Sequence, residues 1–375
     1  MNKTIPGDSC PENGRESASE GEEKTVATLE DVAKLAEVSA MTVSRVINHS
    51  GNVSPATYQS VMAAINKLGY RPNMIARGLA TSKTNSIGVI IPNLENPIYA
   101  VIVSGIYQQA AQYGLDIILG GSTTFEQLLR SADLLLGKQV DGLIILPTAP
   151  DFKLPLEEDG VVFYEHLKQL SDDLAGCLPM VVIGNYPVSD SAAKVCIDYY
   201  AGAKQAVHYL YEQGHRRIGM VAHEVRNFGI WGERYRGYTD AMRELNCPVD
   251  ERDILFCSES VGNAFEAALT LKERRSLPTA FYCANDTIAI GVMNALAHNG
   301  FSVPGDVSVI GHDNSVFCEL SNPSLTTVSI ESPCIGKVCV DAIVEKLKSK
   351  EPGFEMGCHV IQPRLVIRSS VRALT

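Results

Sequence analysis

The sequence predicts a small all-α domain with a helix-turn-helix, followed by a larger α/β domain of two lobes built on parallel sheets. Between residues 28 and 69, apolar residues recur at helical spacing in three short segments. From Ser86 onward, short apolar strand patterns alternate with helical stretches, which is typical of parallel sheets covered by helices on both faces. This alternation runs for about 280 residues, too many for one sheet, so we expect two lobes with a ligand cleft between them.

Each of the three predicted helices of the first domain carries a start signal. Thr28 and Asp31 form the Ser/Thr-x-x-acid pattern of a helix N-terminus. The signals of the other two helices are Ser39 ahead of a helix from Ala40 to about Asn48, and Ser54 with Pro55 ahead of a helix that Gly69 closes. Three short helices, the first two joined by a tight turn, predict a helix-turn-helix bundle.

The strands predicted for the second domain are short and apolar. They lie at 87–91, 115–119, 142–146, 180–183, 195–197, 219–222, 280–283 and 307–310, and the helical stretches between them include 98–113, 201–213 and 286–299. Because parallel strands end at the same edge of a sheet, the residues that follow them are the candidates for ligand binding.

Charge is distributed unevenly along the chain. The net charge is −11, yet residues 28–85 carry six basic and three acidic residues, and no Asp or Glu occurs from Val38 to Leu94. The basic residues inside that window are Arg45, Lys67, Arg71, Arg77 and Lys83. Since a surface that faces phosphates must exclude acidic side chains, the window predicts contact with nucleic acid there, and the acidic remainder would repel it.

Other sequence signals bear on location and on metal chemistry. No apolar run is long enough to span a membrane, and the N-terminal residues lack the apolar segment of a secretory signal. The ten cysteines are scattered, with none in a CxxC or metal-ligand spacing. They are typical of small buried residues in a reducing compartment, so we expect a cytoplasmic protein without a metal site.

The stretch TLEDVAKLAEVSAMTVSRVINHSGNVSPATYQSVMAAINKLGYRPNMIARGLATSKTNSIGVIIPNLENPIYA resembles the LacI/GalR family of transcription regulators. Similar segments follow in the expected order: QVDGLIILP, QGHRRIGMV, ERYRGYTDAM, PTAFYCANDTIAIGVMNAL, VPGDVSVIGHDNS, PSLTTVSI and QPRLVIRSS. The resemblance covers about residues 27–372. It implies a homodimeric DNA-binding regulator under effector control, with a two-lobed sensor like a periplasmic sugar-binding protein. A repressor is the first expectation, and an activator is the alternative.

Domain boundaries are predicted from the polar, aperiodic composition of the N-terminal residues and from the resemblance. These are a disordered tail at 1–26, the helix-turn-helix domain at 27–72, a hinge helix and linker at 73–85, and an effector-binding and dimerisation domain at 86–375. Within the last, the N-lobe is predicted at about 86–198 and 331–358, and the C-lobe at about 199–330 and 359–375. Helices 98–113 and 286–299 are the expected interface between the two copies.

The second helix is predicted to read a near-palindromic operator in double-stranded DNA. Its expected DNA-facing residues are Ser39, Ala40, Met41, Thr42, Ser44, Arg45 and Asn48. Arg45 is the predicted base reader, because Arg can donate two hydrogen bonds to guanine. Local base specificity would come from Ala40 and Met41. The polar side chains of Thr42, Ser44 and Asn48 would bind DNA phosphates or cap the helix. Alternatively, Arg45 is a solvated surface charge, and Met41 is a helix residue without a contact to DNA.

A further DNA contact is predicted in the hinge segment from Ala76 to Ala80. In the family this segment folds when two copies meet on DNA, and Leu79 matches the residue that wedges into a minor-groove step. Arg77 is expected to contact DNA beside it. Alternatively, Leu79 packs against the sensor. Gly78 departs from the bulkier residues often found there, which should make the unbound hinge helix scarcer.

The ligand contacts of the sensor are predicted from its strand ends together with the resemblance, which implies that Tyr99, Asn285 and Asp313 match positions lining the cleft in the family. They are Asn93, Tyr99, Trp231, Arg234, Asn285 and Asp313. Arg234 opens an Arg-x-x-Gly-Tyr pattern, whose Arg reaches the effector in the family. Planar polar side chains pair with vicinal hydroxyls and aromatic faces suit the apolar side of a sugar, so a sugar is the first expectation, with a sugar phosphate or nucleobase next. Trp231 could instead be a core residue, and Asp286 is expected to cap the following helix.

Three further departures from the family pattern lie in the sensor. Gly184 stands where Asp often follows the strand, His312 stands where an aromatic residue is usual, and Lys153 to Gly176 is an insertion, interpreted as an added surface helix.

Two other functions are disfavoured by the sequence. An enzyme is disfavoured because the HxxxH, HExxH and GxSxG spacings and a glycine-rich phosphate loop are absent from the sequence. A transport-type binding protein would leave residues 28–80 without a role. We therefore expect no catalysis and no cofactor.

Overall fold

The structure is a computed structural model that describes residues 27–48, 50–71, 83–94, 96–147, 156–174, 178–225, 229–274, 276–349, 351 and 354–374, without the side chains of 156–164. Its contacts divide the chain into two units, Met1–Ala80 and Thr81–Thr375. None of the helices in the described ranges has both the length and the apolar character that crossing a membrane requires.

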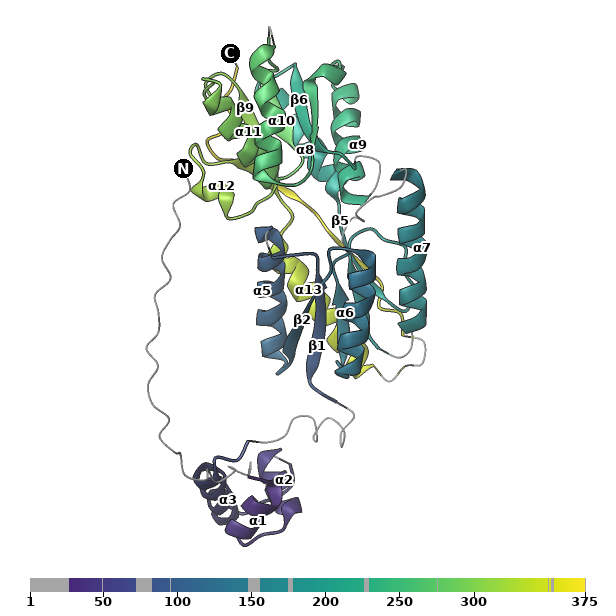
Figure 1. The fold of residues 1–375 in the computed structure, drawn as a ribbon, viewed down its shortest axis with the longest axis vertical. Coiled ribbons are helices and arrows are strands. Elements are labelled where there is room, and N and C mark those ends of the chain that lie inside the picture. Colours follow the sequence, from purple (N-terminus) through teal and green to yellow (C-terminus); the bar gives the residue numbers. More distant parts are fainter. Residues whose placement is uncertain are drawn as a thin grey trace, which may run out of the picture. The chain divides into compact units, whose positions relative to one another are not determined.

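The first unit contains the predicted helix-turn-helix. Its helices are α1 (Leu29–Leu35), α2 (Ala40–Ile47) and α3 (Pro55–Leu68), shown in Figure 1. The predicted caps form: Ser39 Oγ accepts a hydrogen bond from the Thr42 N–H at 3.2 Å, and Thr28 and Asp31 cap each other. Gly69 ends α3 at a φ of 60°, a conformation that glycine adopts without steric cost. The apolar stripes meet in a small core of Val32, Ala33, Ala36, Val43, Val46, Val61 and Ala64.

The second unit is built on two six-stranded sheets, one in each lobe. The first sheet is parallel throughout, in the order β11 (Cys358–Ile361), β5 (Ala193–Ile197), β4 (Met180–Ile183), β3 (Gly142–Ile145), β1 (Ser86–Ile91) and β2 (Asp116–Gly121). The second has the order β12 (Arg364–Val366), β10 (Thr326–Ser329), β9 (Ser308–Asp313), β8 (Ala280–Cys283), β6 (Ile218–His223) and β7 (Ile254–Cys257), and β12 alone of these six strands is antiparallel to its neighbour. The predicted two-lobed α/β fold is thereby confirmed.

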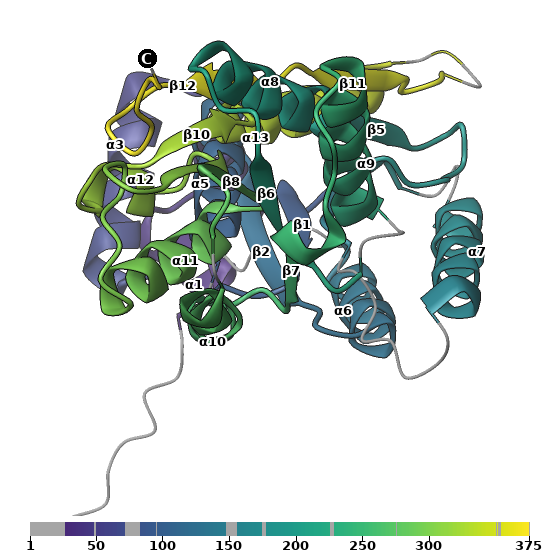
Figure 2. The same cartoon turned by 90° about the horizontal axis from the view of Figure 1, so that it is seen from above.

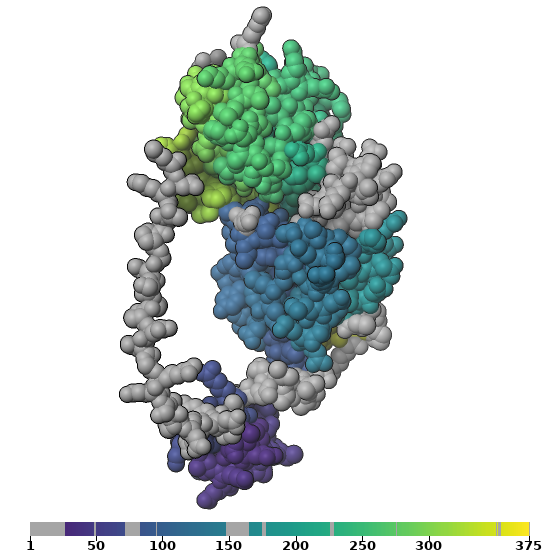
Figure 3. Space-filling view, viewed as in Figure 1, coloured from purple at the N-terminus to yellow at the C-terminus, as the bar shows by residue number. Residues whose placement is uncertain are grey.

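Helices cover both faces of each sheet. On the first sheet, α5 (Pro97–Gln112) and α13 (Ser332–Lys348) pack on one face, and α6 (Phe125–Gly137) and α7 (Leu156–Leu174) pack on the other. On the second, α8 (Tyr199–Glu212) and α9 (Gly229–Glu244) lie opposite α10 (Val261–Leu269) and α11 (Asp286–His298), as Figure 2 shows. The short α12 (Phe317–Leu320) follows β9. In Figure 3 the first lobe appears mainly in blue and the second mainly in green.

The insertion at Lys153 to Gly176 contains the long helix α7. Its Leu167 is fully buried in the core formed with α6 and the first sheet, and Leu174 is nearly so. The helix therefore covers a sheet face rather than standing apart from the lobe.

The chain crosses between the lobes three times: after β5, between β10 and α13, and between β11 and β12. The last crossing lies a few residues later than the predicted boundary at residue 358. Strand β11 pairs with β5 from Cys358 opposite Lys194 to Ile361 opposite Ile197, so it belongs to the first lobe. Backbone pairing across the two strands, which local sequence does not reveal, decides this boundary.

Candidate ligand cavity and nucleic-acid interface

The second helix of the small unit presents most of its predicted DNA-facing residues on its surface. Val43 and Val46 are buried on the opposite side and hold the helix on the core. Met41 is 65% exposed, and Ser39, Arg45 and Asn48 are also exposed. Ala40, Thr42 and Ser44 are partly exposed. This surface contains no acidic residue, as the sequence of the helix requires.

Four of these polar residues have hydrogen-bond partners at the ends of the helix: Ser39 with Thr42, and Ser44 with Asn48. Ser39 Oγ caps α2, and Asn48 Nδ2 donates to Ser44 Oγ at 3.2 Å. These bonds orient the side chains at both ends of the helix. Arg77 and Leu79, the predicted hinge contacts, lie outside the described residues.

A cavity between the two lobes collects most of the predicted ligand contacts. Tyr99 lines it from the first lobe, and Trp231, Arg234 and Asp313 line it from the second. Its volume is 60 Å³, whereas ligand pockets typically have about 300–1,000 Å³. The lobes are therefore closed on each other, and a ligand of sugar size enters only if they move apart.

Arg234 is the central charged residue of this cavity. Its side chain is 1% exposed, and Nη2 donates to Asp313 Oδ1 at 2.5 Å while Nη1 donates to the Ala284 carbonyl oxygen at 2.7 Å. Nε has no hydrogen-bond partner among the described residues. The guanidinium lies 4.6 Å from the centre of the Tyr199 ring and 5.2 Å from that of Trp231. A buried donor without a partner is costly, so this nitrogen is available to an acceptor on a ligand.

Asp313 is held in a conformation that non-glycine residues rarely adopt. Its φ is 104°, at the carboxyl end of β9. Burial raises the pKa of its carboxyl to about 7, and the adjacent Arg234 guanidinium opposes that rise. Backbone strain of this kind costs roughly 1–3 kcal/mol and concentrates at functional sites.

Trp231 forms one wall of the cavity and is also packed. Its ring stacks on His223 with 4.5 Å between ring centres and an interplanar angle of 11°, and the residue is 6% exposed. Burial, and then the positive charge of Arg234, lowers the pKa of His223 to about 4. The imidazole is therefore neutral at neutral pH. The two interpretations of Trp231, ligand platform and core residue, are compatible.

Glu259 is a cavity residue that sequence reasoning missed. It follows β7, a strand absent from the predicted series, and recognising Ile254–Cys257 as a strand would have placed Glu259 at a strand end. Its Oε1 accepts from Asn96 Nδ2 at 2.5 Å and from Asn285 Nδ2 at 2.6 Å. Burial raises the pKa of this carboxyl, and Arg234 and the two amides oppose the rise.

The described residues include two amide–carboxylate hydrogen bonds that bridge the lobes. Asn96 belongs to the first lobe and Glu259 to the second, and Asn185, after β4, donates from Nδ2 to Glu233 Oε1 on α9 at 2.7 Å. Glu233 is also partly buried, and this burial raises its pKa. Both bridges use an amide of the first lobe and a carboxylate of the second.

Two of the predicted ligand contacts are not among the described lining residues of the cavity. Asn93 Oδ1 accepts from the Asn96 N–H at 3.0 Å and so supports the start of α5. Asn285 contacts Glu259 but caps α11, where its Oδ1 accepts from the Ile288 N–H at 2.9 Å.

The prediction that Asp286 caps α11 is wrong, since Asn285 does so. Asp286 is buried, and its carboxylate accepts from the Ser315 N–H and from Thr327 Oγ1, each at 2.6 Å. It therefore ties α11 to the second sheet. His312 is fully buried, with Nδ1 2.9 Å from the Tyr282 hydroxyl, and it is not among the cavity's described lining residues.

The cavity has little positive charge to offer. Arg234 is the one Lys or Arg among its described lining residues, and Asp313 already neutralises it. Glu259 adds a second carboxylate. Within the described residues, no group of three or more His, Cys, Asp or Glu side chains is arranged to hold a metal ion.

Comparison with protein families matches both units. Residues 28–73 match the model described as "Bacterial regulatory proteins, lacI family", and residues 207–371 match the "Periplasmic binding protein-like domain". The HTH-type transcriptional repressor PurR of Actinobacillus pleuropneumoniae serotype 3 is 33% identical over 351 residues, 93% of this chain and 99% of that protein. Catabolite control protein A of Priestia megaterium is 34% identical over 325 residues, 86% of this chain and 93% of that protein.

Solved structures agree with these sequence relatives. The Lac repressor dimer bound to operator and the anti-inducer ONPF superposes with a TM-score of 0.76 at 26% identity, over 93% of this chain and 100% of that one. The complex of the transcriptional regulator CelR with cellobiose has a TM-score of 0.65 at 29% identity, over 92% of this chain and 99% of that one. The relatives named here are regulatory proteins rather than enzymes.

Proposed function

Since this chain belongs to the LacI family of bacterial regulatory proteins, we propose that it is a cytoplasmic transcriptional repressor whose operator affinity is controlled by a sugar or sugar derivative. The observation that carries the proposal is the cavity between the lobes, where Arg234 and Asp313 face Tyr99 across the interface. A ligand bound there contacts both lobes, so it changes how far they close.

The DNA-binding part of the proposal rests on α2. Arg45 reads a base in the major groove, Ala40 and Met41 set the local preference, and Ser39, Thr42, Ser44 and Asn48 contact the backbone. The exposure of Met41, Arg45 and Asn48 over a core that buries Val43 and Val46 supports these roles. The hinge contacts Arg77 and Leu79 complete the interface and stay sequence-based predictions.

A neutral polyol fits the chemistry of the cavity better than an anion. The orphan Nε of Arg234 can donate to a hydroxyl oxygen, and the carboxylates of Glu259 and Asp313 can accept from hydroxyl groups. The aromatic residues Tyr99 and Trp231 line the cavity, and aromatic rings suit the apolar side of a pyranose. A sugar phosphate would bring negative charge beside two carboxylates with one neutralised guanidinium, which is unfavourable in a buried site. The cellobiose complex of CelR supports the same ligand class.

Coupling to DNA follows from the closed state of the lobes. The cavity of 60 Å³ must enlarge to admit a monosaccharide, and the bridges Asn96–Glu259 and Asn185–Glu233 must be replaced or rearranged. Each bridge joins the lobes directly, so the ligand acts on their relative position. Linkage then requires that ligand and operator change each other's affinity by the same factor.

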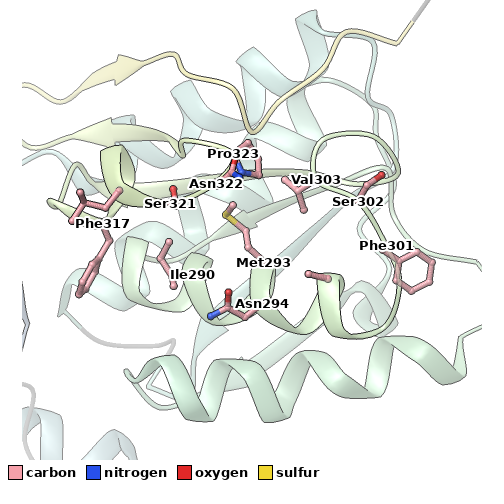
Figure 4. Close-up of a pocket in the computed structure, with 12 residues that line it drawn as sticks. Ile290, Met293, Asn294, Phe301, Ser302, Val303, Phe317, Ser321, Asn322 and Pro323 are labelled. Carbon is pink, nitrogen blue, oxygen red and sulfur yellow. The ribbon is translucent and has the colours of Figure 1, made fainter.

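A homodimer is part of the proposal, with α5 and α11 in the interface. Near α11, a groove of 520 Å³ runs between that helix and α12, lined by apolar residues such as Met293, Phe301 and Phe317, which Figure 4 shows. Leu320 at its rim is 75% exposed, and Tyr107 on α5 is 59% exposed. Exposed apolar surface of this kind marks protein interfaces, and the Lac repressor structure contains a dimer.

The proposal is tested in two linked steps. Operator DNA is first selected from a random duplex library with the full-length protein, and sugars, sugar phosphates and nucleobases are screened by thermal shift. Operator affinity is then measured with and without the best ligand, and ligand affinity with and without operator. We expect a neutral sugar to bind and both affinities to change by one common factor. Unchanged operator affinity at saturating ligand refutes the switch, and binding of a phosphorylated or heterocyclic ligand alone refutes the sugar.

A further inference from the structure

Two cysteines without a role in the proposed function lie side by side on the first sheet. Cys196 Sγ is 3.4 Å from Cys358 Sγ, although the residues are 162 positions apart in the chain. The register of β5 and β11 places Cys358 opposite Lys194 and Cys196 opposite Val360. Because side chains alternate along a strand, the two cysteines are diagonal neighbours on one face of the sheet.

The two sulfurs differ in their surroundings. Strand β11 is at the end of the sheet and pairs only with β5, and its Cys358 is exposed. Cys196 is partly buried; burial, and then its contact with Cys358, raises the pKa of its thiol to about 12. An oxidant in solution therefore reaches Cys358 first, and Cys196 stands beside it as the second thiol.

We propose that Cys196 and Cys358 are a redox-responsive pair that hydrogen peroxide converts to a disulfide within one chain. The Cys358 sulfur attacks a peroxide oxygen, the O–O bond breaks, and a sulfenic acid and one water form. The Cys196 sulfur then attacks the Cys358 sulfur; the S–S bond forms, the S–O bond breaks, and the hydroxide leaves with the thiol proton as a second water. Two thiols lose two electrons and two protons, and one peroxide is reduced to two waters.

Bond formation acts on the strands that connect the lobes. A disulfide has an S–S length of about 2.05 Å, so the sulfurs must approach from 3.4 Å, and the diagonal placement requires β11 to shift along β5. An edge strand held on one side can make that shift. Strand β5 leads into the first interlobe crossing and β11 into the third, so the disulfide couples two of the three connections.

The pair also touches the ligand cavity. The Cys196 thiol donates to the Gly184 carbonyl oxygen at 3.7 Å, and Gly184 lines the cavity. Oxidation removes this donor from the end of β4, next to Asn185 and its bridge to Glu233. The redox state of the pair is thereby transmitted to the cavity wall.

The test starts from fully reduced, full-length protein treated with hydrogen peroxide, alkylated and digested with trypsin. We expect peptides 195–204 and 351–364 to appear joined, lighter by two hydrogen atoms than their sum, and to separate after treatment with dithiothreitol. Amide hydrogen exchange should slow in β5 and β11 of the oxidised protein. Cys334→Ser removes another exposed cysteine, on α13, and should behave as the wild type.

Two variants separate the steps. Cys358→Ser should form no cross-link, and Cys196→Ser should stop at a sulfenic acid on Cys358 that dimedone traps. The proposal is overturned if peroxide concentrations that oxidise Cys334 leave peptides 195–204 and 351–364 unjoined, or if Cys358 pairs only with Cys358 of a second chain. Faster exchange in β5 and β11 after oxidation overturns the proposed coupling of the strands.

Discussion

Asn96, at the start of α5 in one lobe, donates from Nδ2 to Oε1 of Glu259 in the other lobe at 2.5 Å. The same oxygen accepts from Asn285, the cap of α11, so the bridge joins the starts of two helices from different lobes. Because the Glu259 carboxylate is partly buried, its bond to Asn96 is charge-assisted and less screened than an exposed one. Lobe closure and the chemistry of the cavity therefore depend on one carboxylate.

Asn96→Ser should loosen this closure. Serine keeps the capping function that Asn96 performs for α5 but cannot reach Glu259. A hydrogen bond to a charged group contributes about 1.5–3 kcal/mol, so the open form should gain population and small-angle X-ray scattering should give a larger radius of gyration. Asn263→Ser removes an exposed bond within one lobe and should leave the scattering unchanged. Identical scattering from Asn96→Ser and the wild type would show that the bridge does not hold the lobes.

Arg234→Gln should destabilise the sensor strongly. The substitution leaves the buried Asp313 carboxylate without its partner, and breaking a buried pair costs about 3–5 kcal/mol. Urea unfolding measures the loss. The double variant Arg234→Gln/Asp313→Asn should lose less than the sum of the single variants. Arg252→Gln breaks an exposed pair with Asp250 and should cause no measurable change; equal effects at Arg234 and Arg252 would contradict the central role of the buried pair.

The low pKa of His223 should make the stability of the folded protein depend on pH. Its folded pKa of about 4 lies below the ordinary value of 6.5, so between these values the unfolded chain binds a proton that the folded chain does not. Stability is therefore lost as pH falls through this window, by up to about 1.4 kcal/mol per pH unit for one proton.

His223→Gln removes this contribution and keeps those of the carboxyls, whose raised pKa values act in the opposite direction. The difference in unfolding free energy between wild type and variant should shrink from pH 6.5 to pH 4. His359→Gln, at an exposed position, is the matched control. If the difference in unfolding free energy between wild type and His223→Gln stays constant with pH, the pKa of His223 is not lowered by folding.

Arg45→Ala should relax base preference at one position in each half-site. Loss of a bidentate contact to guanine costs about 1–3 kcal/mol in operator affinity. Selection from a random duplex library with wild type and variant measures the preference, and titration against salt measures the phosphate contribution. Lys34→Ala, at an exposed basic residue of α1, should leave the preference intact. If Arg45→Ala lowers affinity equally for all sequences, Arg45 contacts phosphate instead.

Leu320→Asp should weaken dimerisation. It places a charge on an exposed side chain that lines the groove beside α11, in the surface proposed for the interface. Sedimentation velocity at micromolar concentration should show monomer where the wild type is a dimer. Leu134→Asp changes a leucine that is 57% exposed on α6, outside the proposed interface, and should stay dimeric. If Leu320→Asp and Leu134→Asp are both dimeric, the groove beside α11 is not part of the dimer interface.

The sequence was sufficient for the architecture and for placing four of the six residues predicted as ligand contacts around one cavity. Thr28, Ser39 and Ser54 each cap a helix through a residue three positions away, so neighbouring residues determine where the helices begin. Four residues line one cavity because parallel strands end at a common edge: Tyr99, Trp231, Arg234 and Asp313. The strand pattern predicts that edge, and the family resemblance selected Tyr99, Arg234 and Asp313 there.

Contacts between distant residues needed the tertiary structure. Glu259 meets Asn96 across 163 positions, and Cys196 meets Cys358 across 162. The capping role of Asn285, the burial of Asp286 and the position of the third crossing likewise depend on how helices and strands pair. Strand register and lobe closure bring these side chains together, and both are set by the packing of whole sheets, because no short segment of sequence contains both partners of such a contact.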